Sequence, residues 1–539
     1  MGHLWKAIFA IAFIFGKGDA NDCNPYRVDD VVIACICNST YCDGPSDGEL
    51  EVPKEGSSFW YVTNKEGLRM HKSEVSFGSC DSTPHDTTLV IDRTKKFQTI
   101  LGFGGGFTDA AGINMNKLSP ATREQLMRAY YDPKRGSGYT LGRIPCGGTD
   151  FSTRSYTYDD VVNDTLLAHF ALAEDDYKYK IPYARKALEL NKKTLFFSAA
   201  WSPPAWMKTS NKTNGYGFLE EKHYQTYANY LVKFMDEYKK HGIDMWAIST
   251  GNEPLNAFAF NLPLLTNGWT PQMVADWIAN YLGPTLSSSA HNKTLVLALD
   301  DNRYVLPWFV EPTLANKTSA KYVVGTAVHW YQDFVAPAYL LDRTHDEFPD
   351  KIILMTEASV CKYPYIYSIP PLTWRDICLF LVFTIQAVDP VWNTSKVKDE
   401  SWYRGQKYIL SIIEYMNHWA VGWVDWNLAL DASGGPTWQG DYLDSAIIVN
   451  PDADEFYKQP AYYAIHHVSR FVDRGSVRIS INDDSSAVDA TAFLTPSKEV
   501  VAVLYNRDSV PKHVMLNDLQ KGTLCLELSP LSMNTFKYK

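Results

Sequence analysis

The sequence predicts an α/β fold: a (β/α)8 TIM barrel with an associated β-sandwich domain and a small disulfide-rich β module. In the middle of the chain, short apolar runs alternate with longer amphipathic segments, which is typical of repeated βα units. Both ends alternate apolar and polar residues, as half-buried strands do. Four cysteines crowd together near the start. The expected boundaries are 1–20 for a signal peptide, 21–47 for the disulfide-rich module, 48–96 with 474–539 for the β-sandwich, and 97–473 for the barrel.

The start of the chain has the pattern of a cleaved secretory signal. Residues 1–20 contain a lysine, a short apolar run and a small-residue end at Ala20. The run is too short to span a bilayer, and no transmembrane segment is visible elsewhere. Two local disulfides are expected next, and a zinc site is the weaker alternative because no histidine falls among the ligands. The four cysteines are Cys23, Cys35, Cys37 and Cys42.

The charge and the glycosylation signals fit a secreted chain. The formal net charge is -10 and no basic run occurs, which argues against nucleic-acid binding. An acidic chain is repelled by anionic membranes at neutral pH, and histidine protonation in an acidic compartment would weaken that repulsion. An odd total of 9 cysteines leaves at least one thiol unpaired or paired between chains. N-x-[ST] sequons begin at Asn38, Asn163, Asn211, Asn292, Asn316 and Asn393.

The barrel is expected from apolar runs that each suit one buried strand. Helix-like segments such as 220–242, which ends in basic residues and a glycine, separate the runs. The stretch GFGGGF has Phe107 where the dinucleotide fingerprint requires glycine, so we interpret Gly102–Phe107 as the first barrel strand and its turn. The later strands are expected in TLGRIPC, TLFFSAAWS, MWAIST, LVLALDD, VVGTAVHWY, KIILMTEAS and AVGWVDWNL.

Two glutamates end apolar runs at the face where the active site of such a barrel lies. Glu253 follows Met245–Ile248, and Pro254 pushes it away from the right-handed helical region, which predicts a rigid extended corner. Glu357 ends the run Ile352–Met355 in the same way. Active sites of these barrels lie at the carboxyl ends of the strands. The pair therefore indicates glycoside hydrolysis, in which one carboxyl protonates the leaving oxygen and the other attacks or activates water.

Several longer strings resemble one known family. They are STGNEP, LMTEAS, AVHWYQDFVAPA, GRIPCGGTDFSTRSYTY, SAAWSPPAWMKT, VGWVDWNLALDASGGPTW and CICNSTYCD. Together they resemble the lysosomal glucosylceramidases, the acid β-glucosidases that cleave glucosylceramide, in one register from about Cys23 to the end. The resemblance implies hydrolysis of glucosylceramide to glucose and ceramide by a two-glutamate retaining mechanism, without a metal or another cofactor.

The resemblance also implies roles for individual residues. Glu357 would be the nucleophile and Glu253 the acid/base, with carboxyls ~5–5.5 Å apart. Asn252 would hydrogen-bond the 2-hydroxyl of the sugar. For each further residue, packing of the barrel is the alternative role. The further residues implied are Asp150, Trp201, Tyr331 and Trp426 for substrate binding, with Arg143 and His329 in support.

The family implies glucosylceramide at a membrane surface, with a saposin-type activator and anionic lipids as partners. It implies the lysosomal lumen, or secretion, as the location. Two other functions stay open: a retaining β-glycosidase of the same fold that acts on soluble glucosides, and a catalytically inactive sugar- or lipid-binding relative. Turnover of glucosylceramide against soluble glucosides separates the first two, and the presence of both carboxylates and Asn252 argues against the third.

The sequence departs from the family at two places. Asp441 stands where vertebrate members carry an asparagine at the pocket rim, which leaves the fine substrate preference open. The strongly acidic balance leaves the affinity for anionic lipid open. In addition, Cys361–Gln386 lengthens the loop after the nucleophile strand, and its apolar part, Ile377–Ile385, suits a membrane-contacting lid. A retained intron and an inert insertion are the alternatives for this segment.

Overall fold

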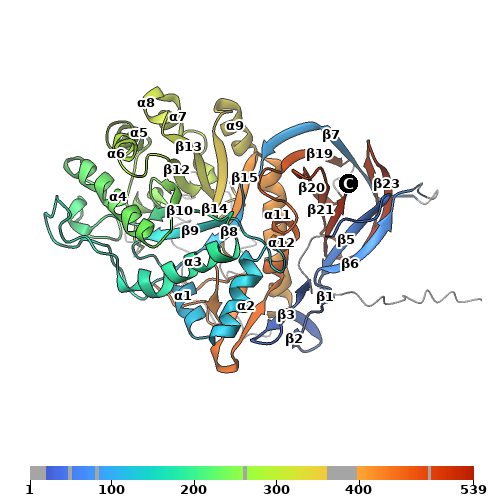
Figure 1. The fold of residues 1–539 in the computed structure, drawn as a ribbon. Coiled ribbons are helices and arrows are strands. Elements are labelled where there is room, and N and C mark those ends of the chain that lie inside the picture. The colour runs from blue at the N-terminus through green and yellow to red at the C-terminus, as the bar shows by residue number, and fades with distance from the viewer. Residues whose placement is uncertain are drawn as a thin grey trace, which may run out of the picture.

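The computed structural model describes residues 20–45, 51–78, 80, 84–258, 264–360, 397–483 and 487–539. The insertion at 361–386, the sequon at Asn393 and the predicted signal sequence before Ala20 lie outside these residues. A closed parallel barrel and a nine-stranded sheet make up most of the fold, with the barrel on the left of Figure 1 and the sheet on the right.

The barrel is built from eight parallel strands that pair in chain order and close on themselves. GFGGGF supplies the first of these strands, as predicted. The (β/α)8 prediction is therefore confirmed. The strands are β8 (Gly102–Gly106), β9 (Leu141–Cys146), β10 (Leu195–Ala200), β11 (Met245–Ser249), β12 (Leu295–Asn302), β13 (Val323–His329), β14 (Ile352–Glu357) and β15 (Ala420–Asn427).

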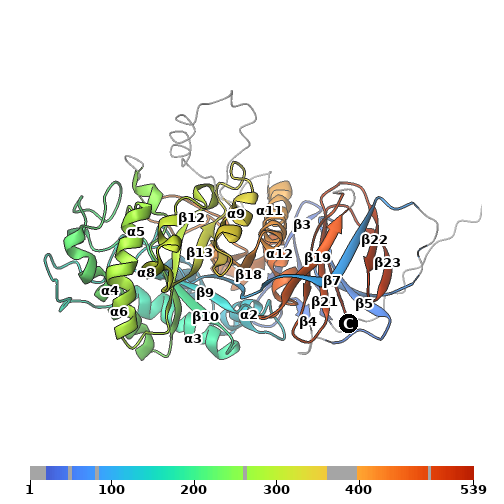
Figure 2. The same ribbon diagram turned by 90° about the horizontal axis from the view of Figure 1, so that it is seen from above.

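Helices follow the strands and cover the outside of the barrel (Figures 1 and 2). The segment predicted at 220–242 forms α4 (Tyr224–Lys240), which buries one face and ends in two lysines. The others are α1 (Asp109–Asn116), α2 (Pro120–Tyr131), α3 (Ile181–Leu190), α5 (Pro271–Trp277), α6 (Gly283–Ser288), α7 (Glu311–Ala315), α8 (Lys317–Ala320), α9 (Tyr339–Glu347), α11 (Val397–Asn417) and α12 (Pro460–Ser469).

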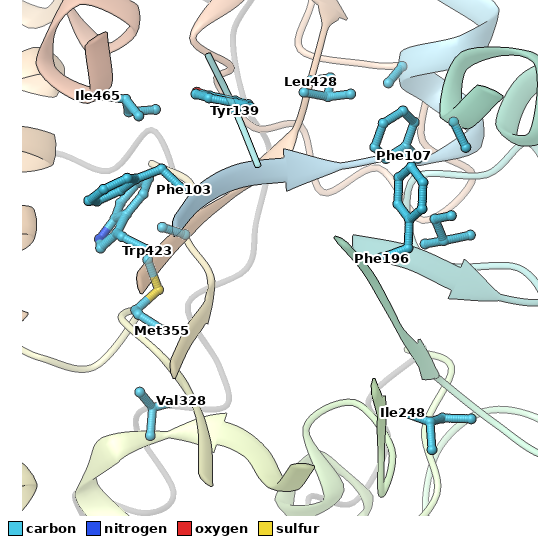
Figure 3. Close-up of a cluster of buried hydrophobic side chains, with 14 of the residues drawn as sticks. Phe103, Phe107, Tyr139, Phe196, Ile248, Val328, Met355, Trp423, Leu428 and Ile465 are labelled. Carbon is cyan, nitrogen blue, oxygen red and sulfur yellow. The ribbon is translucent and has the colours of Figure 1, made fainter. Parts of the chain in front are cut away.

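Successive residues of a barrel strand fall into different apolar cores, because side chains alternate across a strand. Phe196 belongs to the large cluster between the strands and the helices, whereas its neighbour Phe197 belongs to a small cluster. Seven strands each contribute one or two residues to this small cluster, and it fills the interior of the barrel. Figure 3 shows members of the outer cluster, including Phe103, Met355 and Trp423. Burial on both faces explains why the strands read as continuous apolar runs.

The nine-stranded sheet folds over on itself. Leu524 and Tyr538 lie on strands far apart in the sheet order, yet they belong to one apolar core. The two halves of the sheet therefore face each other, as in the predicted β-sandwich. In sheet order the strands are β23 (Gly522–Leu528), β22 (Lys512–Asp518), β7 (Thr87–Thr99), β19 (Val477–Asp483), β20 (Asp489–Leu494), β21 (Val500–Asn506), β24 (Ser532–Tyr538), β5 (Ser57–Asn64) and β6 (His71–Ser76).

The cysteine-rich start and a segment that follows the last barrel strand together form a five-stranded sheet. The two predicted local disulfides are confirmed as Cys23–Cys35 and Cys37–Cys42, and a third joins Cys80 to Cys525. Cys146 is a buried free thiol. The sheet runs β16 (Leu430–Asp431), β17 (Ile447–Asn450), β18 (Glu455–Lys458), β3 (Val31–Cys37) and β2 (Pro25–Val28), and β1 (Ala20–Asn21) pairs separately with β4 (Gly44–Pro45).

The helix α11 connects the three parts. It packs against β15 of the barrel, β20 of the nine-stranded sheet and β3 of the five-stranded sheet. Figure 1 shows α11 and α12 between the barrel and the nine-stranded sheet. Within the ranges that the structure describes, none of the helices is long and apolar enough to cross a membrane.

Candidate active site

The predicted site residues meet at the carboxyl ends of the barrel strands. Glu357 is the last residue of β14 and His329 is the last residue of β13. Asn252 and Glu253 lie three and four residues after the end of β11. The contacts below place all nine residues named from the sequence in one site.

The backbone at Glu253 differs from the prediction. Its φ is +43°, in the left-handed region, so the predicted extended corner is wrong. Pro254 does exclude the right-handed conformation, as expected, and it begins a short 3-10 helix over Pro254–Phe258. The Glu253 amide donates to the carbonyl oxygen of Asp300 at 2.9 Å, which holds this unusual backbone in place. The carboxylate thus leaves the chain at a sharp turn between β11 and the helix.

Each of the two glutamates contacts a different cation. The nearest carboxylate oxygens of Glu253 and Glu357 and a ring nitrogen of His329 all lie within 4.8 Å of one another. Arg143, fully buried in β9, donates through Nη1 to Glu357 and through Nη2 to the side-chain oxygen of Asn252 at 2.8 Å. His329 Nδ1 lies 2.9 Å from Oε1 of Glu253. Each glutamate therefore has a cationic partner of its own.

Asp300 supports both cations, and sequence reasoning missed it. Its Oδ2 accepts from Arg143 Nη2 at 2.8 Å, and its Oδ1 lies 3.1 Å from His329 Nε2. Thr356 also donates to Oδ1, at 2.7 Å. A bulge in β12 presents this carboxylate: the pairing with β13 shifts register here, and Leu299 and Asp300 have φ of +75° and +62°. An acid ending the run LVLALDD was the same signal that marked Glu253 and Glu357.

His329 is held as an imidazolium. Burial alone would lower its pKa, but Glu357, Asp300 and Glu253 outweigh that effect and raise the pKa to about 10. Both ring nitrogens then carry protons and donate, one toward Glu253 and one toward Asp300. The same cations, chiefly Arg143, hold the pKa of the buried Asp300 carboxyl below its usual range against the effect of burial.

Opposing influences act on Glu357. Burial raises its pKa, and Glu253 adds to this, while Arg143 and His329 lower it; the net direction is upward. Tyr331 donates its hydroxyl to Oε1 at 2.8 Å, which favours the ionised form. The nucleophile predicted from the sequence is thus a buried carboxyl whose raised pKa is limited by two cations and a hydroxyl.

Two tryptophans and an aspartate complete the site. The rings of Trp201 and Trp426 stack with centroids 5.1 Å apart, and the Arg143 guanidinium lies over them at 4.9 and 5.3 Å. Asp150 follows β9 and is close enough to Glu357 and Glu253 for both to raise its pKa, in addition to burial and Asp441. Both tryptophan rings therefore pack against the cation that contacts Glu357.

The site is a poor match for a metal ion. Glu253, His329 and Glu357 could offer three ligand atoms at suitable separations. A histidine that is protonated on both nitrogens has no lone pair to give, however, and the raised pKa of His329 makes proton loss costly. The second possible group contains Cys37 and Cys42, whose sulfurs are joined to each other.

Comparisons with known proteins identify relatives of this chain. Residues 100–366 and 372–472 match the glycosyl hydrolase family 30 TIM-barrel domain, and residues 475–536 match the family 30 beta sandwich domain. The lysosomal acid glucosylceramidase of Mus musculus is 36% identical over 539 residues, covering 98% of this chain and 97% of the mouse chain. The resemblance to glucosylceramidases is thereby confirmed.

More distant proteins are similar in sequence or in structure. The endo-1,6-beta-D-glucanase neg1 of Aspergillus fumigatus is 25% identical over 449 residues, covering 78% of this chain and 81% of the fungal chain. The crystal structure of SrfJ from Salmonella typhimurium superposes with a TM-score of 0.78 at 24% identity, covering 90% of this chain and 99% of that chain. With the family domains matched over most of its length, the chain belongs to glycosyl hydrolase family 30, a family of glycoside-hydrolysing enzymes.

Proposed function

We propose that the chain is a retaining β-glucosidase that hydrolyses glucosylceramide to glucose and ceramide. The observation that carries the mechanism is the short separation of Glu253 and Glu357, whose nearest oxygens lie within 4.8 Å. Retaining enzymes hold their carboxyls ~5–5.5 Å apart, whereas inverting enzymes need ~6.5–9.5 Å to admit a water molecule. The name of the mouse relative supports glucosylceramide as the substrate.

In the first step, a Glu357 oxygen attacks the anomeric carbon while Glu253 gives its proton to the departing ceramide oxygen. The products are free ceramide and a glucosyl ester of Glu357. In the second step, Glu253 takes a proton from water, the water oxygen attacks the anomeric carbon, and Glu357 leaves as a carboxylate. We expect Asn252, whose side-chain oxygen accepts from Arg143, to hydrogen-bond a sugar hydroxyl as positive charge develops on the ring.

The neighbours of the acid/base allow it to change protonation state. Its Oε1 faces the His329 imidazolium at 2.9 Å, and its Oε2 accepts from the side-chain amide of Asn256 at 2.6 Å. The Asn256 side-chain amide can rotate by half a turn and present its oxygen instead of its nitrogen. It can therefore donate a hydrogen bond to an ionised Oε2, or accept one from a protonated Oε2. In the proposed mechanism Oε2 carries the catalytic proton, because Oε1 accepts from His329.

Exposed apolar side chains around the site support work at a membrane surface. Phe334 is 77% exposed, Trp308 50% and Phe258 41%, and they lie in the segments that follow β13, β12 and β11. Those segments surround the carboxyl ends of the strands, where the site opens. Apolar side chains gathered on one face mark a contact surface, and a lipid surface fits a lipid-linked sugar. Ceramide could then stay in the membrane while the sugar enters the pocket.

The proposed location is the lysosomal lumen, reached by the secretory route, or the outside of the cell. Three disulfides support an oxidising route, because such bonds are rare in cytosolic proteins. The mouse relative is a lysosomal acid glucosylceramidase, which supports the same location. A saposin-type activator and anionic lipids remain proposed partners through the family alone.

Mechanism-based labelling tests the proposal. A 2-deoxy-2-fluoro-β-glucoside with a good leaving group should form a stable ester on Glu357, which peptide mapping by mass spectrometry locates. Glu357→Gln should lower turnover by more than about 10³-fold without loss of folding, because the covalent step needs an ionised oxygen. Glu527→Gln, at an exposed position on β23, is the matched control. A label on any other residue would refute the assignment of the nucleophile.

A second candidate is hydrolysis of soluble glucans, which the fungal endo-1,6-beta-D-glucanase relative favours. The purified chain should be assayed on glucosylceramide in detergent-free vesicles and on a soluble β-1,6-linked glucan, over mildly acidic to neutral pH. Faster turnover of the glucan than of glucosylceramide would overturn the proposed substrate and leave the proposed mechanism standing. Absence of turnover on both substrates would favour the inactive relative.

A further inference from the structure

Two aspartates meet in the pocket beside the proposed catalytic glutamates. Asp150 follows β9, and Asp441 lies in the segment after β15; the strand β8 stands between β15 and β9 in the barrel. Their carboxyl groups lie close enough for each to affect the pKa of the other. Thr437 fastens the contact, because its hydroxyl lies 2.5 Å from Oδ1 of Asp441 and 2.9 Å from the carbonyl oxygen of Asp150. The contact is thus built into the loops and does not depend on chance orientation of two side chains.

A hydrogen bond between two carboxyls requires a proton on one of them, since ionised carboxylates only accept. The charged groups that act most strongly on Asp150 are acidic: Asp441 beside it, Glu357 from β14 and Glu253 from the segment after β11. Burial is the largest influence on both members of the pair and raises the pKa of each. Across the part of the chain that the structure describes, neither forms an ion pair with lysine, arginine or histidine. The surroundings therefore favour a pair that keeps one proton.

The second oxygen of Asp150 is placed to bind a ligand. Its Oδ1 is buried, and no donor among the described residues reaches it. The aspartate lies close to the proposed nucleophile and acid/base, so a hydroxyl of a sugar bound between them can donate to this oxygen. Filling a buried acceptor that is otherwise unpaired recovers the free energy lost on its desolvation.

We propose that the Asp150–Asp441 pair binds the sugar only while it holds one proton, so that Asp441 is a positioning residue that makes substrate affinity depend on pH. The inference rests on the proposed function, since it assigns Asp150 to the sugar. With one proton, the two carboxyls attract each other and hold Asp150 toward the ligand. After that proton is lost, the two negative charges repel, and Asp150 moves from its position. Affinity should fall as pH rises through the titration of the pair.

The test measures binding separately from turnover. Phenyl 1-thio-β-D-glucoside, which is neutral and resists hydrolysis, is titrated into the full chain by calorimetry from about pH 4.5 to about pH 8.5. The expected result is a Kd that rises about tenfold for each pH unit once the pair begins to lose its proton. The same pH series with 4-nitrophenyl β-D-glucoside as substrate should show the rise in KM, while kcat follows the protonation of Glu253 and Glu357.

Asp441→Asn is the decisive variant. An asparagine amide donates to Asp150 without having an acidic proton to lose, so Kd for the thioglucoside should become nearly independent of pH. Asp441→Leu removes the donor and should bind weakly throughout the pH range. Asp452→Asn, an exposed position that makes the same change in charge, should keep the wild-type pH dependence. Thermal unfolding of each variant checks that it is folded at every pH.

The outcomes separate this inference from the proposed function. A Kd that does not change with pH in the wild type, or that changes equally in Asp441→Asn, overturns the role of the pair even if glucosides are hydrolysed. Failure of the folded wild type to bind the thioglucoside at any pH overturns it as well. Loss of the pH dependence in Asp441→Asn supports the pair even if turnover shows that the proposed substrate is wrong.

Discussion

Asp300 is the residue through which the two proposed catalytic glutamates are coupled. Its carboxylate contacts neither glutamate, but it holds Arg143, the partner of Glu357, and His329, the partner of Glu253. Because all of these groups are buried, the position of each cation depends on the fixed charge behind it. A change at Asp300 should therefore reach both steps of the reaction.

Asp300→Asn is expected to lower kcat/KM for a soluble aryl β-glucoside by about 100-fold, since small displacements of catalytic groups cost about this much. The asparagine keeps the shape but removes the charge that helps to hold His329 as an imidazolium and Arg143 in line with Glu357. Steady-state kinetics measure the effect, and circular dichroism confirms the fold. Asp346→Asn, which removes an exposed carboxylate from α9, serves as the control. Equal kcat/KM in both variants would show that Asp300 is a packing residue.

Tyr331→Phe is expected to move the acidic limb of the pH profile. The Tyr331 hydroxyl favours ionised Glu357, so its removal raises further a pKa that burial already raises. The nucleophile must be ionised, and activity should therefore appear only at higher pH than in the wild type. The measurement is kcat/KM against pH, with Tyr339→Phe, an exposed tyrosine, as the control. A shift of the acidic limb toward lower pH would contradict this account of Glu357.

At the scale of elements, the barrel strands were the easiest features to predict and the backbone of the site was the hardest. Apolar runs such as MWAIST specify a strand buried on both faces whatever its partners are. The bulge at Leu299–Asp300 and the left-handed turn at Glu253 leave no such pattern, because they depend on hydrogen bonds formed only in the closed barrel. Pro254 restricts Glu253 but does not choose between the conformations that are left.

The loop that carries Asp150 depends on a buried lysine at the start of α3. Lys180 donates to the carbonyl oxygens of Pro145 and Gly147 at 3.3 and 2.9 Å. Its charge is balanced by Asp109 at 3.5 Å and Asp176 at 3.3 Å, and all three side chains are buried. The end of β9 is therefore tied to the helical layer through one cation.

Lys180→Met should destabilise the fold by about 3–5 kcal/mol, because it leaves two buried carboxylates without their cation. Thermal or denaturant unfolding measures this loss. Lys178→Met is the matched control: this lysine is exposed and pairs with exposed Glu174, so its removal should cost less than about 1 kcal/mol. Similar stabilities of the two variants would mean that the carboxyls become protonated at no cost.

At the scale of the whole molecule, the pairing of distant segments lay beyond the sequence. The two disulfides within the segment 23–42 can be predicted because its four cysteines are close in the sequence. The bond from Cys80 to Cys525 cannot, because the scattered cysteines allow many other pairings. In the same way, β3 pairs with β18, whose residues follow the barrel. Such contacts form only after the barrel has brought both segments to one side, so no local pattern records them. The prediction that residues 48–96 and 474–539 form one β-sandwich came from the family resemblance.

The apolar side chains around the mouth of the barrel give a prediction about where the enzyme works. Phe334 is 77% exposed in the segment after β13, three residues beyond Tyr331 of the pocket. Phe334→Ser should lower the rate on glucosylceramide in vesicles by about tenfold, since full burial of such a side chain contributes about 1.5–3 kcal/mol. The rate on a soluble aryl glucoside should change little, because the exposed ring forms no part of the proposed sugar contacts.

Leu519→Ser is the control, because this leucine is 60% exposed in the turn between β22 and β23, away from the barrel. Vesicle sedimentation of both variants would show whether the lost rate comes from lost attachment. If Phe334→Ser reduced turnover of both substrates equally, the ring would act on the pocket and the membrane surface would have to be sought elsewhere. A lower turnover rate on vesicles alone, together with less protein sedimenting with the vesicles, would place the lipid surface against the mouth of the barrel. The glucosylceramide headgroup would then reach Glu357 without its ceramide leaving the membrane.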